Sequence, residues 1–273
     1  SDIGCYGSEI ETPHLDALAK GGLRFTDFHN NPRCCPSRAS LLTGMYPHQA
    51  MGVMTNDHGL YPYPAYIDDL SRNCVTIAGA LKAGGYTTLM TGKWHLTPLG
   101  PGEDKHSWPR QRGFDRYYGI LQGSVSYFDP ATLTLDNEPI EVSKEDRNFY
   151  LTDAIGEYST KFIEEAAGKD KPFFLYAAFT AGHWPLMARE DKIAKYKGRY
   201  ATGWDAMRRA RHSKQLSLGI VKEQWGLTER DPRVPAWDVV SFKEWEQRRM
   251  EVYAAQIDSL DENVGKMSPS EET

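Results

Sequence analysis

The sequence lacks several features that would place it in a broad class at once. No apolar run approaches the ~20 residues that a membrane-spanning helix needs. Basic residues are not in excess: the formal net charge is -5, which argues against a protein that works by coating nucleic acid. The four cysteines include no pair with the C-x-x-C spacing of a zinc site. Any anionic substrate must therefore be attracted by local positive charge.

No secretory leader is visible either, but the chain begins with Ser1 rather than Met, so we expect the true N-terminus to be missing. The polar residues 268–273 are predicted to form a frayed tail. With 273 residues, 40% of them apolar and 25% charged, the chain matches an ordinary soluble globular protein of one large or two small domains. A core of that size needs no disulfides.

Helical and strand patterns alternate along the chain, which predicts an α/β layered fold. Helices are expected at residues 12–22, capped by Thr12, and at 36–42, 76–83, 153–167 and 250–264. Their expected buried faces include Leu15, Leu18 and Ala19, then Ile77, Ala80 and Leu81, and finally Tyr253, Ile257, Leu260 and Val264. Strands are expected at 24–29, 86–91 and 172–179, and the last is a continuous apolar run typical of a strand buried on both faces. The Gly-, Pro- and aromatic-rich stretch 100–143 is predicted to be a long ordered excursion.

The most informative segment is CCPSRASLLTG, residues 34–44. Cys34 stands at the entry of a short helix, where free N–H groups and the helix dipole favour an anion. Arg38 follows four residues later, so both side chains project from one helix face. Its guanidinium offers a fork of donors to an oxyanion. A lone cysteine in such a place is more often a packing residue, so the interpretation depends on the whole run.

Two further segments place basic side chains after predicted strands. Lys93 and His95 are two residues apart after the strand at 86–91, and in extended chain they point to the same side. His183 follows the strand at 172–179. A Lys-x-His pair or a lone histidine is a weak signal alone, typical of a solvated loop or a structural hydrogen bond. Both segments nevertheless lie where α/β folds place their sites.

Residues 34–44 resemble the sulfatase signature C-x-P-S-R-x-x-x-L-T-G, and residues 85–95 resemble the second signature, G-Y-x-T-x-x-x-G-K-W-H. With weaker likenesses elsewhere, the chain resembles arylsulfatase-type sulfatases over nearly its whole length. The resemblance implies an alkaline-phosphatase-like sandwich, in which helices flank a mostly parallel central sheet. Residues 1–273 would then be the incomplete N-terminal part of a single catalytic domain.

The resemblance also implies a mechanism for cleaving a small-molecule or carbohydrate sulfate ester. A formylglycine-generating maturation enzyme would oxidise Cys34 to formylglycine, whose hydrate attacks sulfur and then releases sulfate by re-forming the aldehyde. Lys93 would hold the sulfate oxygens, and Arg38 an oxyanion or the oxygen of the modified residue. His95 would hold the hydrate and withdraw its proton, and His183 would contact sulfate or protonate the leaving oxygen.

A calcium ion bound by oxygen ligands is a further implication of the resemblance. Its ligand motifs would fall before Ser1 and after Thr273, so we assign no metal ligand to this chain; Asp2 aligns a few positions beyond the expected Asp-Asp pair. We therefore expect the chain as given to be inactive and to hold calcium weakly, as a fragment of a complete gene or the product of a broken one. The resemblance implies a periplasmic or secreted protein.

Three other interpretations remain open. A phosphonate monoester or phosphodiester hydrolase of the same superfamily can carry the same cysteine signature, and a non-catalytic relative could serve as a binding module. A nucleic-acid binder would use the basic stretch Lys192, Lys195, Lys197, Arg199, Arg208, Arg209, Arg211 and Lys214. Acidic residues interspersed among these favour a solvated helical face instead, so we expect neither a nucleic-acid partner nor a membrane span.

Overall fold

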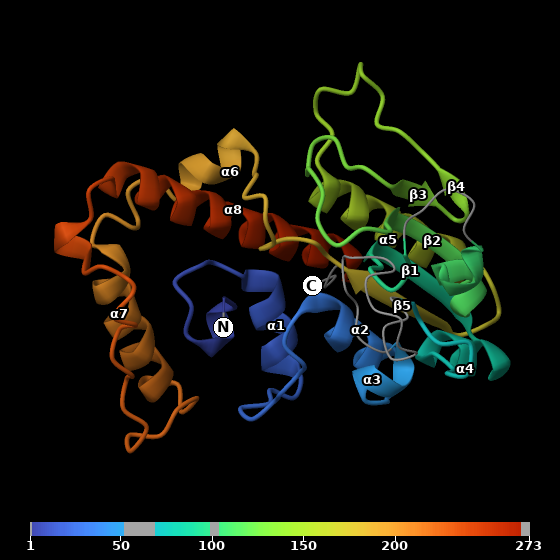
Figure 1. Ribbon diagram of the computed structural model, residues 1–273, viewed down its shortest axis with the longest axis horizontal. Helices are drawn as coiled ribbons and strands as arrows, with labels where there is room; N and C mark the ends of the chain where they lie inside the picture. The colour runs from blue at the N-terminus through green and yellow to red at the C-terminus, as the bar shows by residue number, and fades with distance from the viewer. Residues whose placement is uncertain (1, 52–68, 99–103, 269–273) are drawn as a thin grey trace, which may run out of the picture. The chain divides into compact units, whose positions relative to one another are not determined.

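The computed structural model describes residues 2–51, 69–98 and 104–268 (Figure 1). The chain divides into two compact units, one of residues 29–180 and one of residues 1–28 together with 181–273, and each is described by itself. The expectation of a single domain over residues 1–273 stays a prediction. Apart from Ser268, the predicted frayed tail lies outside the described residues, as do residues 100–103 of the predicted excursion.

The unit of residues 29–180 is built on a mixed five-stranded sheet in the order β4-β3-β2-β1-β5. The strands are β1 (Thr87–Lys93), β2 (Arg116–Ile120), β3 (Leu133–Leu135), β4 (Glu138–Pro139) and β5 (Phe173–Ala178). Strand β1 pairs in parallel with both β2 and β5, whereas β3 and β4 add an antiparallel edge. The predicted α/β class is confirmed, and the parallel part of the sheet is centred on β1.

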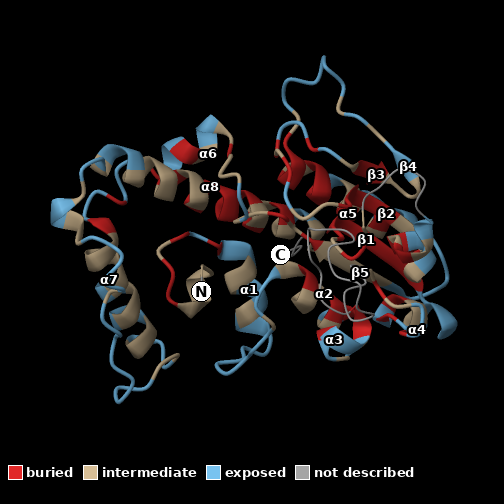
Figure 2. Cartoon of the chain, in the orientation of Figure 1, coloured by how far each residue is buried: buried red, intermediate tan, exposed pale blue. Residues whose placement is uncertain are grey.

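Strand β1 is buried along its whole length, and Figure 2 shows most of its neighbour β2 buried as well. The polar side chains of β1 are satisfied inside the core: the Thr88 hydroxyl donates to the Gly113 carbonyl at 2.7 Å, and Thr91 shares a hydrogen bond of 2.6 Å with Ser159. Gly92 has φ 92°, and a Cβ there would lie 2.1 Å from the carbonyl oxygen of Ala178. Only glycine lets β1 and β5 pair at this point.

The described residues of this unit also form the α-helices α2 (Cys34–Thr43), α3 (Pro47–Ala50), α4 (Ile77–Ala83) and α5 (Leu151–Ala167), of which α4 and α5 pack on the sheet. All of the predicted helices here are confirmed, but the predicted face of α4 is wrong. Ala78 is fully buried, while Ile77 is 42% exposed. A helix of seven residues makes only about two turns, so its periodicity cannot select one face. The cap is clear, because Thr76 accepts from the Gly79 N–H at 3.0 Å.

The unit of residues 1–28 and 181–273 is mainly helical. Its elements are the 3-10 helix η1 (Gly4–Tyr6), α1 (Pro13–Gly21), α6 (Glu190–Lys195), α7 (Gly203–Ser217), the 3-10 helix η4 (Trp237–Val239) and α8 (Lys243–Met267). Helix α8, red in Figure 1, is longer than the predicted 250–264 and has buried residues on most of its circumference, including Ala254, Ile257 and Asp258. Of its predicted face, Ile257 is buried and the other three residues are half-buried.

Helix α1 is confirmed, but its predicted cap is wrong. The Thr12 hydroxyl accepts from the Gly4 N–H at 2.8 Å and donates to Asp16 at 3.1 Å, so it is not available to the helix. The first N–H groups of α1 donate instead to the Asp261 carboxylate of α8, at 3.1 Å from His14 and 2.8 Å from Leu15. A cap from 246 residues away leaves no local sequence signal.

Three other expectations differ from the structure. Residues 24–29 form no strand and make side-chain hydrogen bonds instead: the Tyr6 hydroxyl donates to the Phe25 carbonyl at 3.0 Å, and the Arg24 side chain donates to the Cys5 carbonyl at 2.7 Å. Leu18 is 55% exposed. Strand β5 lies at an edge of the described sheet and is mostly half-buried, so it is not enclosed on both faces.

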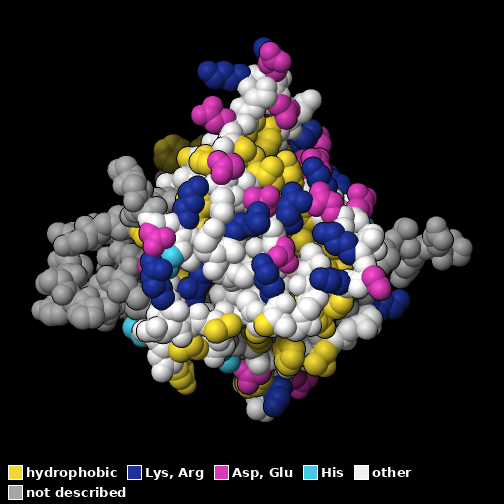
Figure 3. All heavy atoms as spheres, turned by 90° about the vertical axis from the view of Figure 1, so that its right-hand side faces the viewer, with side chains coloured by type: hydrophobic (Ala, Val, Ile, Leu, Met, Phe, Trp, Pro, Cys, Tyr) yellow, Lys and Arg dark blue, Asp and Glu magenta, His cyan; other side chains and the backbone are white. Residues whose placement is uncertain are grey.

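Charges of both signs lie on the face of the protein drawn in Figure 3, where Lys and Arg are interleaved with Asp and Glu. The basic stretch in the helical unit also forms ion pairs: Lys195 contacts Asp258 at 2.8 Å, Arg199 contacts Glu11 at 2.7 Å, and Lys192 pairs with Glu262. These pairs favour a charge-balanced face over a nucleic-acid surface. Among the described residues, no helix has the length and apolarity to cross a membrane.

Candidate active site

Cys34 is the first residue of α2 and lies at the mouth of a pocket of about 490 Å³. Arg33 precedes the helix in an unusual conformation, φ 73° and ψ 157°, and Gly44 ends the helix with φ 68° and its N–H on the Ser40 carbonyl. Non-glycine residues with such positive φ are uncommon and concentrate at functional sites. The pocket is lined by Asn30, Asn31, Pro32, Arg33, Cys34, Ser37, Arg38, Leu41 and Tyr176.

The end of β1 brings two basic side chains to Cys34. Lys93 is only 2% exposed, and its Nζ donates to the Gly123 carbonyl at 2.5 Å. The backbone of His95 has φ 56°, and its Nδ1 lies 3.1 Å from Cys34 Sγ. Trp94 points away and donates from Nε1 to the Ser107 carbonyl at 2.9 Å. The alternation expected from the sequence is thus seen, although β1 ends before His95.

Arg38 links the helix to the sheet beside the same pocket. Its Nη1 donates to the Lys93 carbonyl at 2.6 Å and contacts the Tyr176 hydroxyl of β5 at 3.4 Å. Its Nε is buried and has no acceptor among the described residues. Because the observed partners are a carbonyl and a hydroxyl, no carboxylate neutralises the guanidinium, and its positive charge remains available to an anion.

The cluster strongly favours a thiolate at Cys34. The pKa of Cys34 is lowered, first because the Cys35 thiol donates to it and then because His95 and Lys93 stabilise its negative charge. The same hydrogen bond, together with burial, raises the pKa of Cys35. Burial lowers the pKa of Lys93, and the charge of Arg38 adds to that effect. Cys34 is therefore the more readily deprotonated thiol of the pair, and Cys35 is a proton donor to it.

Gly123 supports both Lys93 and His95 in the cluster, and it was not predicted from the sequence. Its carbonyl accepts from Lys93, and a Cβ at this position would lie 2.2 Å from His95 Cε1. The sequence did contain a signal for this residue, namely a glycine just beyond the end of the parallel strand β2. The residues of β2 were predicted to belong to the ordered excursion, so this signal was not recognised. Tyr176 and Cys35 were missed as well, because neither stands at a specified position of a signature.

His183 belongs to the other unit, whereas Cys34, Arg38, Lys93 and His95 belong to residues 29–180. It is an exposed residue, and its Nδ1 makes a hydrogen bond of 2.7 Å with the Trp184 carbonyl. The predicted convergence of His183 on Cys34 therefore stays a prediction. The structure brings the other four predicted residues together.

A calcium ion does not fit the donors of this cluster. Across residues 2–51, 69–98 and 104–268, the one group of three or more His, Cys, Asp or Glu side chains close enough to hold a metal is Cys34, Cys35 and His95. Calcium prefers about six to eight oxygen ligands, and this group offers sulfur and nitrogen. We therefore derive no catalytic step through calcium.

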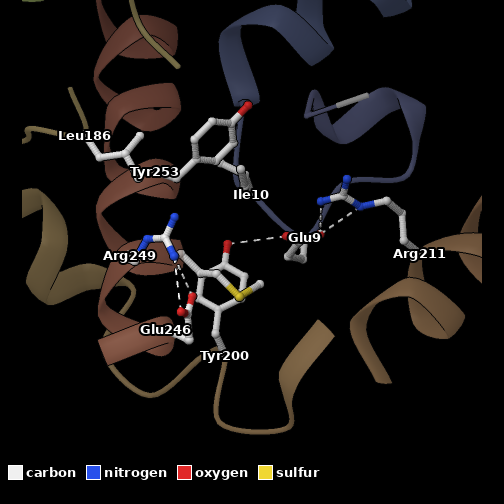
Figure 4. Close-up of a pocket in the computed structure, with 9 residues that line it drawn as sticks. Glu9, Ile10, Leu186, Tyr200, Arg211, Glu246, Arg249 and Tyr253 are labelled. Atoms are coloured by element: carbon white, nitrogen blue, oxygen red, sulfur yellow. Dashed lines mark hydrogen bonds and ion pairs between the residues drawn. The ribbon is translucent and has the colours of Figure 1, made fainter. Parts of the chain in front are cut away.

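A second cavity, of about 320 Å³, lies in the helical unit (Figure 4). Glu9 is held there by Arg211, at 3.0 and 2.6 Å, and by the Tyr200 hydroxyl at 3.3 Å. Arg249 pairs with Glu246 at 2.9 Å. The charged groups of this cavity neutralise each other, so it is a weaker candidate for an anion site than the pocket at Cys34.

The family model of the sulfatases, described as Sulfatase, matches residues 1–267. The chain belongs to the sulfatase family. It is 34% identical to an uncharacterized sulfatase of Schizosaccharomyces pombe over 98% of this chain and 51% of that protein. It is 32% identical to an arylsulfatase of Klebsiella aerogenes over 98% of this chain and 58% of the relative. The chain thus spans about half the length of these curated relatives.

Solved structures of sulfatases share the fold. The structure of a sulfatase from Bacteroides fragilis aligns with a TM-score of 0.70 and 25% identity, covering 98% of this chain and 54% of that one. Ps i-CgsB in complex with k-i-k-neocarrahexaose aligns with a TM-score of 0.66 and 26% identity, covering 97% of this chain and 51% of that one. The expected alkaline-phosphatase-like architecture of a sulfatase is therefore confirmed.

Proposed function

We propose that the pocket at Cys34 hydrolyses sulfate monoesters. The observation that carries this proposal is the convergence of a thiolate-prone Cys34 with His95 Nδ1 at 3.1 Å and with the cations Lys93 and Arg38. Two cations beside one nucleophile suit a tetrahedral oxyanion, and α2 adds the positive end of its dipole. Because the chain belongs to the sulfatase family, a sulfate ester is favoured over other tetrahedral anions as the substrate.

Cys34 is proposed to be converted to formylglycine by a maturation enzyme. Its Sγ stands in for the oxygens of the aldehyde hydrate, with His95 Nδ1 at 3.1 Å as the neighbouring hydrogen-bonding group. That hydrate supplies one hydroxyl that attacks sulfur, and a second whose deprotonation re-forms the aldehyde as sulfate leaves. Position supports Cys34 over Cys35, since Cys34 lines the pocket and Cys35 is 1% exposed.

The other side chains of the cluster have distinct proposed roles. Lys93 stabilises the negative charge on the sulfuryl oxygens, held in place by the Gly123 carbonyl. His95 Nδ1 faces the reacting atom, so it accepts the proton of the hydrate when sulfate is expelled. Arg38 binds a sulfate oxygen and fixes the end of β1. His183 is proposed to protonate the leaving oxygen or to contact sulfate.

We further propose a sulfated carbohydrate or aryl sulfate as the substrate. One structural relative was solved with a carrageenan-type hexaose, and curated relatives are arylsulfatases. The pocket of about 490 Å³ can hold the sulfated end of such a molecule. A periplasmic or secreted location belongs to the same proposal.

Parallel assays of an aryl sulfate and the matching aryl phosphate test this function in the full-length protein expressed with a maturation enzyme. Sulfate turnover should exceed phosphate turnover, and Cys34→Ala should abolish it while Cys74→Ala, a buried thiol outside the pocket, retains it. Faster turnover of phosphate or phosphonate esters would contradict the proposal and favour the related phosphonate or phosphodiester hydrolases. Full activity of Cys34→Ala would remove the pocket from catalysis.

A further inference from the structure

The first turn of α2 and the end of β1 bring two thiols and an imidazole together. The sulfurs of Cys34 and Cys35 and a ring nitrogen of His95 all lie within 4.8 Å of one another. Cys34 and His95 are half-buried, and Cys35 is 1% exposed. The three donors thus converge from two separate elements, and Cys34 among them lines the pocket.

This donor set differs from that of the calcium site of the family. Thiolate and imidazole are preferred by thiophilic ions such as Zn²⁺ and Cd²⁺. Tetrahedral zinc, at its usual bond lengths, separates a sulfur from a nitrogen ligand by roughly 3.6 Å. Cys34 Sγ and His95 Nδ1 are 3.1 Å apart, so a small rotation of either side chain would admit an ion.

The neighbouring charges do not prevent this binding. Lys93 and Arg38, together with Arg33 next to Cys34, are the cations beside the cluster, and their charges would oppose a bare divalent ion. Two thiolates neutralise a divalent ion, so the loaded cluster adds no net positive charge next to these cations.

We propose that the unmodified chain binds one thiophilic divalent ion through Cys34 Sγ, Cys35 Sγ and His95 Nδ1, with the fourth position open to a water in the pocket. Each ion forms two metal–sulfur bonds and one metal–nitrogen bond, and each of the two sulfurs that is still protonated releases its proton to the solvent. Conversion of Cys34 to formylglycine removes one of the sulfurs, so the metal-loaded and the matured forms exclude each other. That last consequence rests on the function proposed above, whereas metal binding does not.

Titration of the reduced, unmodified chain with CdCl2 alone tests the proposal. The ultraviolet charge-transfer band of cadmium thiolates reports binding, and native mass spectrometry reports stoichiometry. We expect one ion per chain and a band that requires Cys34. Cys34→Ser, and separately His95→Gln, should weaken binding by about tenfold or more, as even the loss of supporting groups does at metal sites.

Cys5→Ser and Cys74→Ser are the matched controls, because both remove a free thiol outside the cluster. Both should bind cadmium like the unsubstituted chain. Since Cys35 is buried, Cys35→Ser is interpreted only if its circular dichroism matches that of the parent; His95→Gln, on a half-buried residue, gives a second measurement. Binding that survives Cys34→Ser, depends on Cys74, or is absent from the reduced chain would overturn the proposal.

Binding and esterase activity are measured on different forms of the protein, which keeps the two proposals separable. Loss of sulfatase activity with intact cadmium binding would contradict only the proposed function. A matured chain, with formylglycine at Cys34, should lose the charge-transfer band. Retention of the full band after maturation would place the metal elsewhere and contradict the site.

Discussion

The two cavities both contain arginine, but they use it differently. In the helical unit, Arg211 makes two hydrogen bonds to the Glu9 carboxylate. At Cys34, the Arg38 guanidinium donates to a carbonyl and contacts a hydroxyl, and Lys93 likewise donates to a carbonyl. The partner, more than the cation, decides what a cavity can bind. A carbonyl orients a cation and leaves its positive charge available to a ligand, whereas a carboxylate neutralises that charge.

Removing a cation from each cavity is the sharpest test of this difference. In the full-length, matured protein, Lys93→Ala should lower kcat by roughly two or more orders of magnitude, as for the loss of a group that stabilises charge in the transition state. Arg211→Ala should leave kcat per folded molecule unchanged, because its charge is already paired with Glu9. Steady-state kinetics with an aryl sulfate checks both variants.

An unchanged kcat in Lys93→Ala would remove this lysine from the mechanism. A comparable loss in Arg211→Ala would show that the charge balance at Glu9 does not describe its role. Either outcome would break the distinction between the two cavities.

The sequence predicted the core of the site but not its supports. Cys34, Arg38, Lys93 and His95 could be found because the spacing within α2 and along β1 is local. Gly123 and Tyr176 could not, because each joins the site through a strand pairing between distant segments. The same holds for the cap of α1, which Asp261 supplies from α8.

Elements were predicted well where a buried pattern was long, as for β1 and α5. Short or exposed segments were predicted poorly. Residues 24–29 have the composition of a strand but find side-chain partners, and β2 was hidden within a stretch rich in turn residues. A segment forms a strand only when it pairs with a neighbouring strand. Amino-acid composition alone therefore could not predict whether residues 24–29 or the residues of β2 would form one.

The rate of thiol alkylation should also differ between Cys34 in the sheet unit and Cys5 in the helical unit. The pKa of Cys34 is lowered by Cys35, His95 and Lys93, whereas burial and Asp16 raise the pKa of Cys5. At pH 6, iodoacetamide should therefore alkylate Cys34 in the unmodified chain roughly tenfold or more faster than in the urea-denatured chain. Cys5 should react more slowly in the folded chain than in the denatured one.

The sign of the linked stability follows from the lowered pKa. Stabilisation by the Cys34 thiolate is present above the unfolded thiol pKa of about 8.5 and is lost as pH falls through the folded value. Mass spectrometry of alkylated peptides over a pH series gives the profile of each thiol. A folded Cys34 profile that coincides with the denatured one would contradict the assigned hydrogen bonds.

The smallest expected effect concerns stability in the helical unit. Arg211→Ala should lower the free energy of unfolding by about 1–3 kcal/mol, because the half-buried Glu9 carboxylate loses a charged hydrogen-bond partner. Arg233→Ala is the control: Arg233 pairs with Asp231 at 2.7 Å, but its side chain is 88% exposed, so no measurable change is expected. Urea denaturation followed by circular dichroism compares the two. Equal midpoints would show that the Glu9–Arg211 pair contributes nothing to folding.

The central claim is that Cys34 carries the chemistry of this pocket. Peptide mass spectrometry of the active full-length protein, read together with its specific activity, tests it most directly. We predict an aldehyde at Cys34, an intact thiol at Cys35, and sulfatase activity that rises in proportion to the modified fraction. An aldehyde at Cys35 with Cys34 intact, or full activity from a chain whose Cys34 is entirely unmodified, would contradict the account.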